Sequence, residues 1–425
     1  MSVLEKSLRR EFGNRVSEAR DQAEEGARIA LRSLGVDVKD APQGLSDDAR
    51  ALRRRLRAHG RAVGDGLQSD GTQDIAKLVR EVAYEHWHRM LFARFLAEND
   101  LLLLPGTETA ITLDEAKELA ETDGRPWLAY VSDCASRMLP QIFRSDDPAL
   151  ALALPPETQQ ALERIMTGLD VRVFTADDSL GWAYQFWQAR EKERVNATGN
   201  KIGAAELPAV TQLFTEDYMV LFLLHNTLGA WWAGKILAGN PELARTAPDE
   251  QTLRDACGVG DVEWTYLRFV RDEGDNGRWR PAAGTFEGWS KAAKDITVLD
   301  PCMGSGHFLT FALPILTAFR IAEEGLTQSQ AVDAVLRDNL HGLEIDPRCT
   351  QIAAFNLAFT AWRMVGHRTL PRLNLACSGL GITVSKAEWL KLAEKAVAAA
   401  DPAAKRDLLG TEENLLTVGD RKSVV

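Results

Sequence analysis

A glycine-containing turn within residues 296–309, Ile-Thr-Val-Leu-Asp-Pro-Cys-Met-Gly-Ser-Gly-His-Phe-Leu, constrains the fold more than any other stretch of this chain. Four residues with strand propensity lead into an Asp-Pro pair, Gly304 and Gly306 follow, and an apolar helical pattern begins at His307. Glycine permits left-handed backbone angles and the close approach of a ligand, while the free amides at a helix start point outward. The stretch therefore predicts a strand, a tight ligand-binding turn and a helix.

Three classes of ligand use such a turn, and residue spacing separates them. A phosphate-binding P-loop needs a Lys after its last glycine, and none is present. A dinucleotide fingerprint needs a third glycine where Leu309 stands and an acid about 20 residues further on, whereas the next acid that ends a strand is Glu344. The acid that precedes the turn, Asp300, suits a ligand with an ammonium group, and S-adenosylmethionine has one. The remaining alternative is a glycine turn that only connects a buried strand to a helix.

The turn resembles a family motif. Residues 300–308, Asp-Pro-Cys-Met-Gly-Ser-Gly-His-Phe, look like motif I of the adenine-specific DNA methyltransferases, which transfer a methyl group from S-adenosylmethionine to the exocyclic amine of adenine. The resemblance implies that Asp300 holds the amino group of the cofactor and that Gly304 and Gly306 admit its methionine part. The cofactor-binding residues predicted at this motif are Asp300, Pro301, Gly304, Ser305, Gly306 and Phe308.

A second predicted strand, residues 340–345, resembles motif II of the same family. The resemblance implies that Glu344, at the end of this strand, receives the ribose hydroxyls of S-adenosylmethionine and that Ile345 lies against its adenine ring. Without the link to motif I, a lone Glu at a strand end would be interpreted as a surface residue. The order of the two motifs along the chain favours the cofactor-binding interpretation.

Upstream, Phe214 and Thr215 resemble motif X, whose Phe/Tyr-Thr-Pro element precedes motif I and lines the S-adenosylmethionine pocket. Thr215 is predicted to cap a helix over residues 216–228 that Gly229 closes. The departure from the motif is Glu216, where the family usually has proline. An acid at the first helical position interacts favourably with the helix dipole, so the same geometry is expected. Phe214 and Thr215 complete the predicted cofactor-binding set.

The catalytic loop of the family, Asn/Asp/Ser-Pro-Pro-Tyr/Phe, is absent from the sequence. In the family its polar side chain accepts hydrogen bonds from the adenine amine, and its aromatic ring stacks on the flipped base. The only Pro-Pro pair follows Leu154, far upstream of motif I, so no catalytic residue is predicted. Residues 420–425, Asp-Arg-Lys-Ser-Val-Val, match what a common sequencing adapter encodes. We expect them to be a non-native tail on a gene cut near Gly419; a natural basic tail is the alternative.

The predicted fold is a mainly α N-terminal region followed by a partial α/β core, Rossmann-like and of the class I S-adenosylmethionine-dependent type, truncated before the catalytic loop. Three regions are expected, at residues 1–175 (helical), 176–290 (a helical segment with motif X and a connection) and 291–419 (the partial core). Apolar spacing predicts helices over 3–34, 49–62 and 72–104. A solvated helix face with arginine stems packed on apolar surface is favoured over a phosphate contact for Arg53, Arg54, Arg55, Arg57 and Arg61.

Charge, cysteine content and hydropathy bear on partners and compartment. The formal charge of −11 is unusual for a DNA-binding chain, which normally carries a basic footprint. Five scattered cysteines without a Cys-x-x-Cys pair indicate a reducing compartment and predict no metal site. The N-terminal residues lack the apolar core of a signal peptide, and residues 219–237 are interpreted as a buried helix because they include His225, Asn226 and Lys235. A cytoplasmic protein without a membrane partner is expected.

The resemblance points to the large adenine-specific methyltransferases of bacterial restriction-modification and phage-defence systems, such as the BREX, DISARM and Eco57I-like enzymes. It implies methylation of the N6 amine of adenine, S-adenosylmethionine as cofactor, double-stranded DNA bound through a missing C-terminal part, and defence-system proteins as further partners. This fragment alone is expected to be inactive. Two other functions stay open, since fold alone does not set the substrate. One is a scaffold subunit that binds S-adenosylmethionine, and the other is a methyltransferase of small molecules or proteins.

Overall fold

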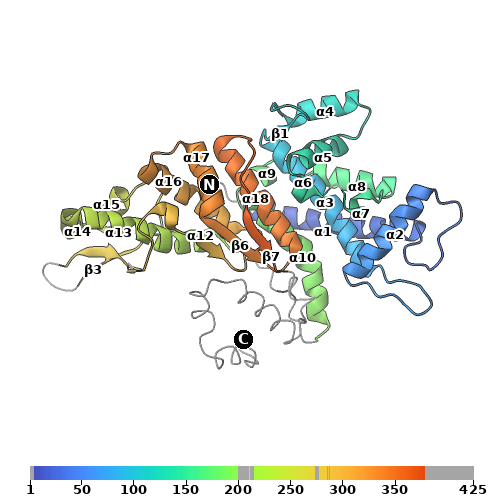
Figure 1. The fold of residues 1–425 in the computed structure, drawn as a ribbon, viewed down its shortest axis with the longest axis horizontal. Helices are drawn as coiled ribbons and strands as arrows, with labels where there is room; N and C mark the ends of the chain where they lie inside the picture. Colours follow the sequence, from blue (N-terminus) through green and yellow to red (C-terminus); the bar gives the residue numbers. More distant parts are fainter. Residues whose placement is uncertain are drawn as a thin grey trace, which may run out of the picture.

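The computed structural model describes residues 4–144, 146–199, 210, 215–272, 277–284, 286 and 288–378 of the 425-residue chain. These residues are mainly helical and include three small β-sheets. The N-terminal helices and the segment of residues 230–281 lie toward opposite ends of an elongated molecule, with a parallel sheet between them (Figure 1).

Among the described residues up to 199, helices predominate and are accompanied by a short antiparallel strand pair. Its elements are α1 (Lys6–Ser33), α2 (Asp47–Ala62), α3 (Ala76–Glu98), β1 (Leu102–Leu103), β2 (Ala110–Ile111), α4 (Leu113–Thr122), α5 (Trp127–Met138), α6 (Pro140–Phe143), α7 (Pro148–Ala151), α8 (Pro156–Thr167), α9 (Arg172–Thr175) and α10 (Ser179–Ala197). The helix predicted over 72–104 was too long. It ends at Glu98 because Asp100 takes a left-handed φ of 55°, after which the chain enters β1.

The arginine run on α2 is partly buried, which corrects the solvated-face interpretation for two of its members. The guanidinium of Arg53 donates to the carbonyls of Gly35 (2.8 Å) and Val38 (2.6 Å), and that of Arg57 donates to the carbonyl of Val36 (2.7 Å). Burial, together with the neighbouring arginines, lowers the pKa of Arg57. The two side chains therefore satisfy backbone carbonyls in the loop after α1.

The next elements, from residue 217 onward, form a helical arm that ends in a β-hairpin. They are α12 (Asp217–Leu224), the π-helical η1 (His225–Gly229), α13 (Ala230–Gly239), α14 (Pro241–Thr246), α15 (Glu250–Ala256), β3 (Phe269–Arg271), β4 (Trp279–Pro281) and the 3-10 turn η2 (Ala293–Asp295). Gly229 does not close the helix as predicted, because η1 passes directly into α13. A Cβ at this glycine would lie 2.7 Å from the Trp264 ring, so close packing accounts for it. The predicted burial of 219–237 holds for one side only, since Met219 and Phe222 are roughly half exposed.

The parallel sheet consists of β5 (Val298–Asp300), β6 (Leu340–Glu344) and β7 (Asn374–Cys377), in the order β5-β6-β7. Helices α16 (His307–Glu324) and α17 (Gln328–Asp338) connect β5 to β6, and α18 (Pro347–Val365) connects β6 to β7. The strands and helices predicted around the glycine turn are thereby confirmed. Parallel strands end at the same edge of a sheet, so the predicted site residues after β5 and β6 share that edge. Apolar spacing in the sequence also predicts a helix over 386–399, and these positions lie outside the described residues.

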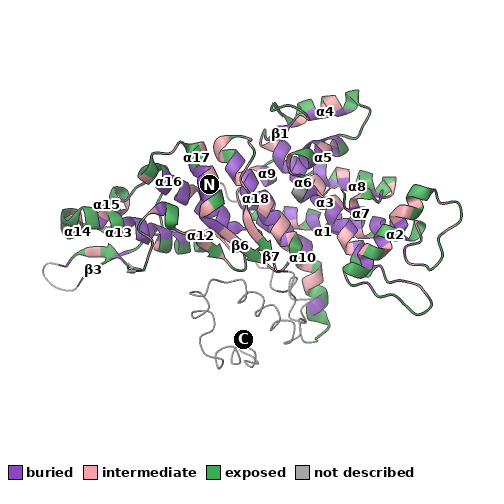
Figure 2. Ribbon diagram, in the orientation of Figure 1, coloured by how far each residue is buried: buried purple, intermediate pink, exposed green. Residues whose placement is uncertain are grey.

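Helix α18 belongs to two hydrophobic clusters at once. One of its faces packs on the N-terminal helices, and the other packs on α16 and the sheet. Most residues of α18 are accordingly buried, which Figure 2 shows in purple. On the first face, the Phe355 ring stacks on Phe92 of α3 with 4.2 Å between ring centroids. On the second, Ala353, Leu357 and Ala361 are buried. Helix α18 therefore joins the helical region to the sheet region, while the predicted domain boundaries stay a prediction.

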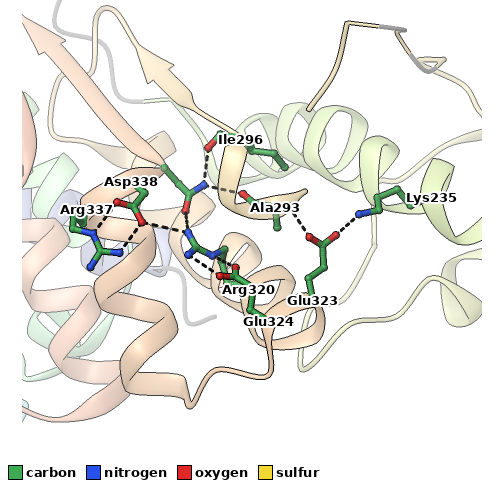
Figure 3. Close-up of polar contacts among 9 residues, drawn as sticks. Lys235, Ala293, Ile296, Arg320, Glu323, Glu324, Arg337 and Asp338 are labelled. Atoms are coloured by element: carbon green, nitrogen blue, oxygen red, sulfur yellow. Dashed lines mark hydrogen bonds and ion pairs between the residues drawn. The ribbon is translucent and has the colours of Figure 1, made fainter. Parts of the chain in front are cut away.

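A polar network holds the chain where it enters β5 (Figure 3). Arg320 donates to the side-chain oxygen of Asn339 (3.0 Å), whose amide nitrogen donates to the Ala293 carbonyl (2.9 Å). Glu323 accepts from the Ala293 N–H (2.7 Å) and pairs with Lys235 of α13. Since these groups are mostly shielded from water, the network fixes where β5 begins and hence where the glycine turn lies.

Within the described ranges, no helix combines the length and apolarity needed to cross a bilayer. Among the same residues, His, Cys, Asp and Glu side chains form no group of three that could hold a metal ion. The side chains of Cys302 and Cys377 are exposed, whereas those of Cys134, Cys257 and Cys349 are buried.

Candidate functional site

The turn between β5 and α16 has the backbone that its glycines predict. Gly304 and Gly306 take left-handed φ angles of 54° and 77°. A Cβ on Gly306 would lie 3.0 Å from the Cβ of Ala353 on α18, so a larger residue is disfavoured by tight packing as well as by the positive φ. The Gly306 N–H donates to the Met303 carbonyl (2.8 Å), and the Met303 N–H donates to the Leu343 carbonyl (3.1 Å). The turn is thus held against the end of β6.

The Glu344 carboxylate locks this turn from the neighbouring strand. One oxygen accepts the N–H of Gly304 at 2.8 Å. The other accepts the N–H groups of Ile345 (2.8 Å) and Asp346 (3.0 Å). Hydrogen bonds to an ionised acceptor are among the stronger ones in proteins, and each carboxylate oxygen has more than one acceptor site. Glu344 can therefore preorganise the turn and still receive donors from a ligand.

Asp300 lies beside Glu344 without a compensating cation. Its carboxylate accepts the Cys302 N–H (3.1 Å), and burial, then the negative charge of Glu344, raise its pKa. Across the part of the chain that the structure describes, neither Asp300 nor Glu344 forms an ion pair. A ligand with a positive charge and several hydroxyl donors would relieve this excess of negative charge. These two carboxylate acceptors thus fit S-adenosylmethionine, which offers an ammonium group, a sulfonium and ribose hydroxyls.

A cavity of about 550 Å³ opens beside Asp300 along the outer edge of β5. That volume is typical of small-molecule sites. Three predicted site residues line it, namely Asp300, Pro301 and Phe308, and its apolar wall comes from Leu224, Leu228, Trp231 and Trp289. A larger cavity of about 690 Å³ between α5 and α18 contains none of the predicted site residues. Gly304 and Glu344 meet each other at the strand ends but do not line the cavity beside Asp300.

The remaining predicted residues lie around this edge with different contacts. Ser305 is buried, and its carbonyl accepts the side-chain N–H of Asn356 (3.2 Å). Thr215 does not cap α12, which corrects the prediction. The N-cap is Glu216, in an extended conformation and without a side-chain cap hydrogen bond, because the helix begins one residue later than predicted. Phe214 lies outside the described residues.

Two residues that the sequence did not single out connect the start of α12 to the turn. The Asp217 carboxylate accepts a hydrogen bond from the His307 ring (2.9 Å), across 90 residues of sequence. His307 occupies the unspecified position of the Gly-Ser-Gly-x-Phe pattern, and Asp217 follows Glu216. Residue spacing cannot predict a contact between residues that are so far apart in the sequence. The one indication was the family resemblance, which implies that the two motifs line the same pocket.

Two known proteins resemble the chain over much of its length, although no family model matches it. It is 25% identical over 353 residues to "Adenine-specific methyltransferase PglX" of Lacticaseibacillus casei (strain Zhang), a match that covers 74% of this chain and 28% of that protein. It is 28% identical over 237 residues to "Adenine-specific methyltransferase BrxX" of Escherichia coli O9:H4 (strain HS), which covers 55% of this chain and 18% of that protein. The chain thus spans less than a third of the length of these curated relatives. They confirm the resemblance to adenine-specific methyltransferases.

Two solved structures are also similar. One is a nuclease-deletion mutant of the Type ISP restriction-modification enzyme LlaGI in complex with a DNA substrate mimic, with a TM-score of 0.37, 14% identity, and coverage of 98% of this chain and 23% of that chain. The other is the ATP-dependent Type ISP enzyme LlaBIII bound to DNA, with a TM-score of 0.35, 12% identity, and coverage of 90% and 20%. Both scores are too low to carry an argument about the fold or the site.

Proposed function

We propose that the chain is the cofactor-binding part of an adenine-specific DNA methyltransferase that uses S-adenosylmethionine to methylate the N6 amine of adenine in restriction-modification or phage defence. The observation that carries this proposal is the similarity to two adenine-specific methyltransferases over up to 74% of the chain. The three parallel strands with crossover helices support a partial Rossmann-like core, with the ligand at the carboxyl edge of the sheet.

The proposed roles of the residues follow from their contacts. Asp300 would accept a hydrogen bond from the ammonium group of the cofactor, and Glu344 would accept from its ribose hydroxyls while it keeps Gly304 in place. When bound, the cofactor supplies an electrophilic methyl group on its sulfonium. The apolar wall of the cavity beside Asp300 would keep water from this group. Burial and Glu344 raise the pKa of Asp300. As the pH falls, Asp300 should therefore become protonated, and cofactor affinity should decrease, at a higher pH than for an ordinary aspartate.

The part of the reaction that involves the base is not assigned to this chain. The Asn/Asp/Ser-Pro-Pro-Tyr/Phe loop is absent from its sequence, so its share is binding and orienting the cofactor. We propose double-stranded DNA as the substrate and defence-system proteins as further partners, because the relatives are adenine-specific methyltransferases. The net charge of −11 and the absent loop favour a second candidate, a scaffold subunit that binds S-adenosylmethionine and assembles with a catalytic partner.

Calorimetric titration with S-adenosylmethionine tests the cofactor site. The wild-type chain should bind, and Asp300→Asn should lose about tenfold or more in affinity, because a hydrogen bond between two charged groups is lost. Glu242→Gln is the control, since this exposed acid pairs with Arg245 on α14, outside the site. An unchanged affinity in Asp300→Asn would contradict the assignment.

A second experiment distinguishes the two candidate functions. The chain is mixed with a separate polypeptide that contains an Asn-Pro-Pro-Tyr/Phe segment, and methylation of duplex DNA is measured. Methylated adenine in unmethylated duplex DNA would support the methyltransferase. Cofactor binding without any DNA methylation would favour the scaffold subunit.

A further inference from the structure

Two adjacent acids at the start of α12 connect three parts of the molecule. Asp217 accepts a hydrogen bond from His307, the first residue of α16 and the neighbour of Gly306. Both side chains are largely shielded, with Asp217 12% and His307 6% exposed. The second oxygen of Asp217 is buried and has no hydrogen-bond partner among the described residues. The hydrogen bond from His307 is thus the main compensation for placing this carboxylate inside the protein.

The preceding acid reaches the N-terminal helix. Glu216 forms an ion pair with Arg9 of α1 (3.4 Å), and the guanidinium of Arg9 lies 4.3 Å from the centre of the Trp182 ring on α10. Asp178 strengthens the same junction, because its carboxylate accepts the Leu4 N–H (2.9 Å) and the Trp182 ring N–H (2.7 Å). Glu216, the residue that departs from the family motif, therefore contacts α1.

We propose that Arg9, Glu216, Asp217 and His307 form a clasp that positions motif X against the glycine turn, so that cofactor affinity depends on α1. This inference rests on the proposed cofactor site. Without the His307 donor, the buried Asp217 carboxylate would have both oxygens unpaired and would turn toward solvent. The first turn of α12 would move with it, together with Thr215, two residues earlier. Asp217 and His307 are positioning residues in this proposal, since they act through the turn and through Thr215.

The wild-type chain is first titrated with S-adenosylmethionine by calorimetry. No binding by the wild type would overturn the proposed function, and the clasp with it. If the wild type binds, His307→Ala should weaken binding about tenfold, while His307→Gln, which keeps an N–H donor, should stay within about threefold of wild type. Equal affinity of His307→Ala and wild type, or equal losses of affinity in the Ala and Gln variants, would contradict the clasp and leave the proposed cofactor site unaffected.

A charge exchange tests the arm of the clasp that reaches α1. Arg9→Glu should weaken binding about two- to threefold, as expected for a partly exposed pair, and the double variant Arg9→Glu with Glu216→Arg should restore it. Arg363→Ala is the matched control, since its ion pair with Asp177 is also partly exposed and likewise reaches the N-terminal half of the chain, but from α18 rather than from α12. Circular-dichroism melting of each variant separates lost affinity from lost folding. An equal loss in Arg363→Ala, or no restoration in the double variant, would contradict the proposed link to α1.

Discussion

Apolar side chains are buried at the interface between α3 and α18, whereas they are exposed along the outer edge of β5. At the interface, Phe92 and Phe355 are stacked and almost fully buried. Along the edge, Leu299 is 62% exposed, and Leu223 on α12, which lines the same cavity, is 49% exposed. Apolar burial is the main stabilising term in folding, whereas exposed apolar surface that adjoins a cavity is typical of binding sites. We therefore expect apolar side chains at the α3–α18 interface to contribute more to stability than those at the β5 edge, where we propose that the ligand binds.

The largest expected effect is a loss of stability at the α3–α18 interface. Phe92→Ala should lower the free energy of unfolding by about 3 to 5 kcal/mol, because it leaves a cavity beneath the stacked Phe355 ring. Urea denaturation followed by circular dichroism measures this change. The control is Phe286→Ala, whose ring is 59% exposed and should matter little. A loss below about 1 kcal/mol in Phe92→Ala would show that the interface does not carry the stability assigned to it.

The second effect concerns a buried acid in the same helical region. Burial raises the pKa of Glu85 to about 7, despite its ion pair with Arg144. The folded protein therefore holds this proton more tightly than the unfolded chain does. The stabilising contribution of the protonated group is full below the ordinary glutamate pKa and is lost as pH rises through about 7.

The substitution Glu85→Gln should remove this pH dependence. The wild-type chain should lose about 1 to 3 kcal/mol relative to the variant between pH 5 and 7.5, as measured by urea denaturation at both values. Wild type and variant must be compared with each other, because two buried histidines also titrate. Burial lowers the pKa of His86 to about 4 and that of His88 to about 3, so these groups stabilise the folded protein as the pH rises. Parallel pH profiles of wild type and variant would contradict the assignment.

The parts that could be predicted from the sequence are those set by local chemistry. The glycine turn, its flanking strand and helix, and Glu344 at the end of the next strand follow from residue type and short spacing, and the structure brings Asp300, Gly304 and Glu344 to one edge. Tertiary contacts decided the rest. Gly229 looked like a helix end but accommodates the Trp264 ring, and the arginines of α2 bind carbonyls that no periodicity reveals.

The site shows the same division between local and distant information. Asp217 and His307 are separated by 90 residues, so their hydrogen bond could not be anticipated from either motif alone. The prediction that Thr215 caps α12 failed because a cap depends on which residue enters the helix first, and here Glu216 stays extended. Sequence motifs thus identified the edge at which a ligand is expected, while the packing that positions this edge required the structure.

The smallest expected effect is a change in stability at the exposed outer edge of β5. Leu299→Ala removes an apolar side chain from the edge of β5, yet the free energy of unfolding should change by less than about 0.5 kcal/mol, because the residue is already mostly in water. Val220→Ala is the matched control, a fully buried apolar residue on α12 that should cost clearly more. Urea denaturation of both variants decides the matter. A loss in Leu299→Ala comparable to that in Val220→Ala would mean that this edge is covered in the folded protein, and the distinction between a stabilising interface and a recognition edge would fail there.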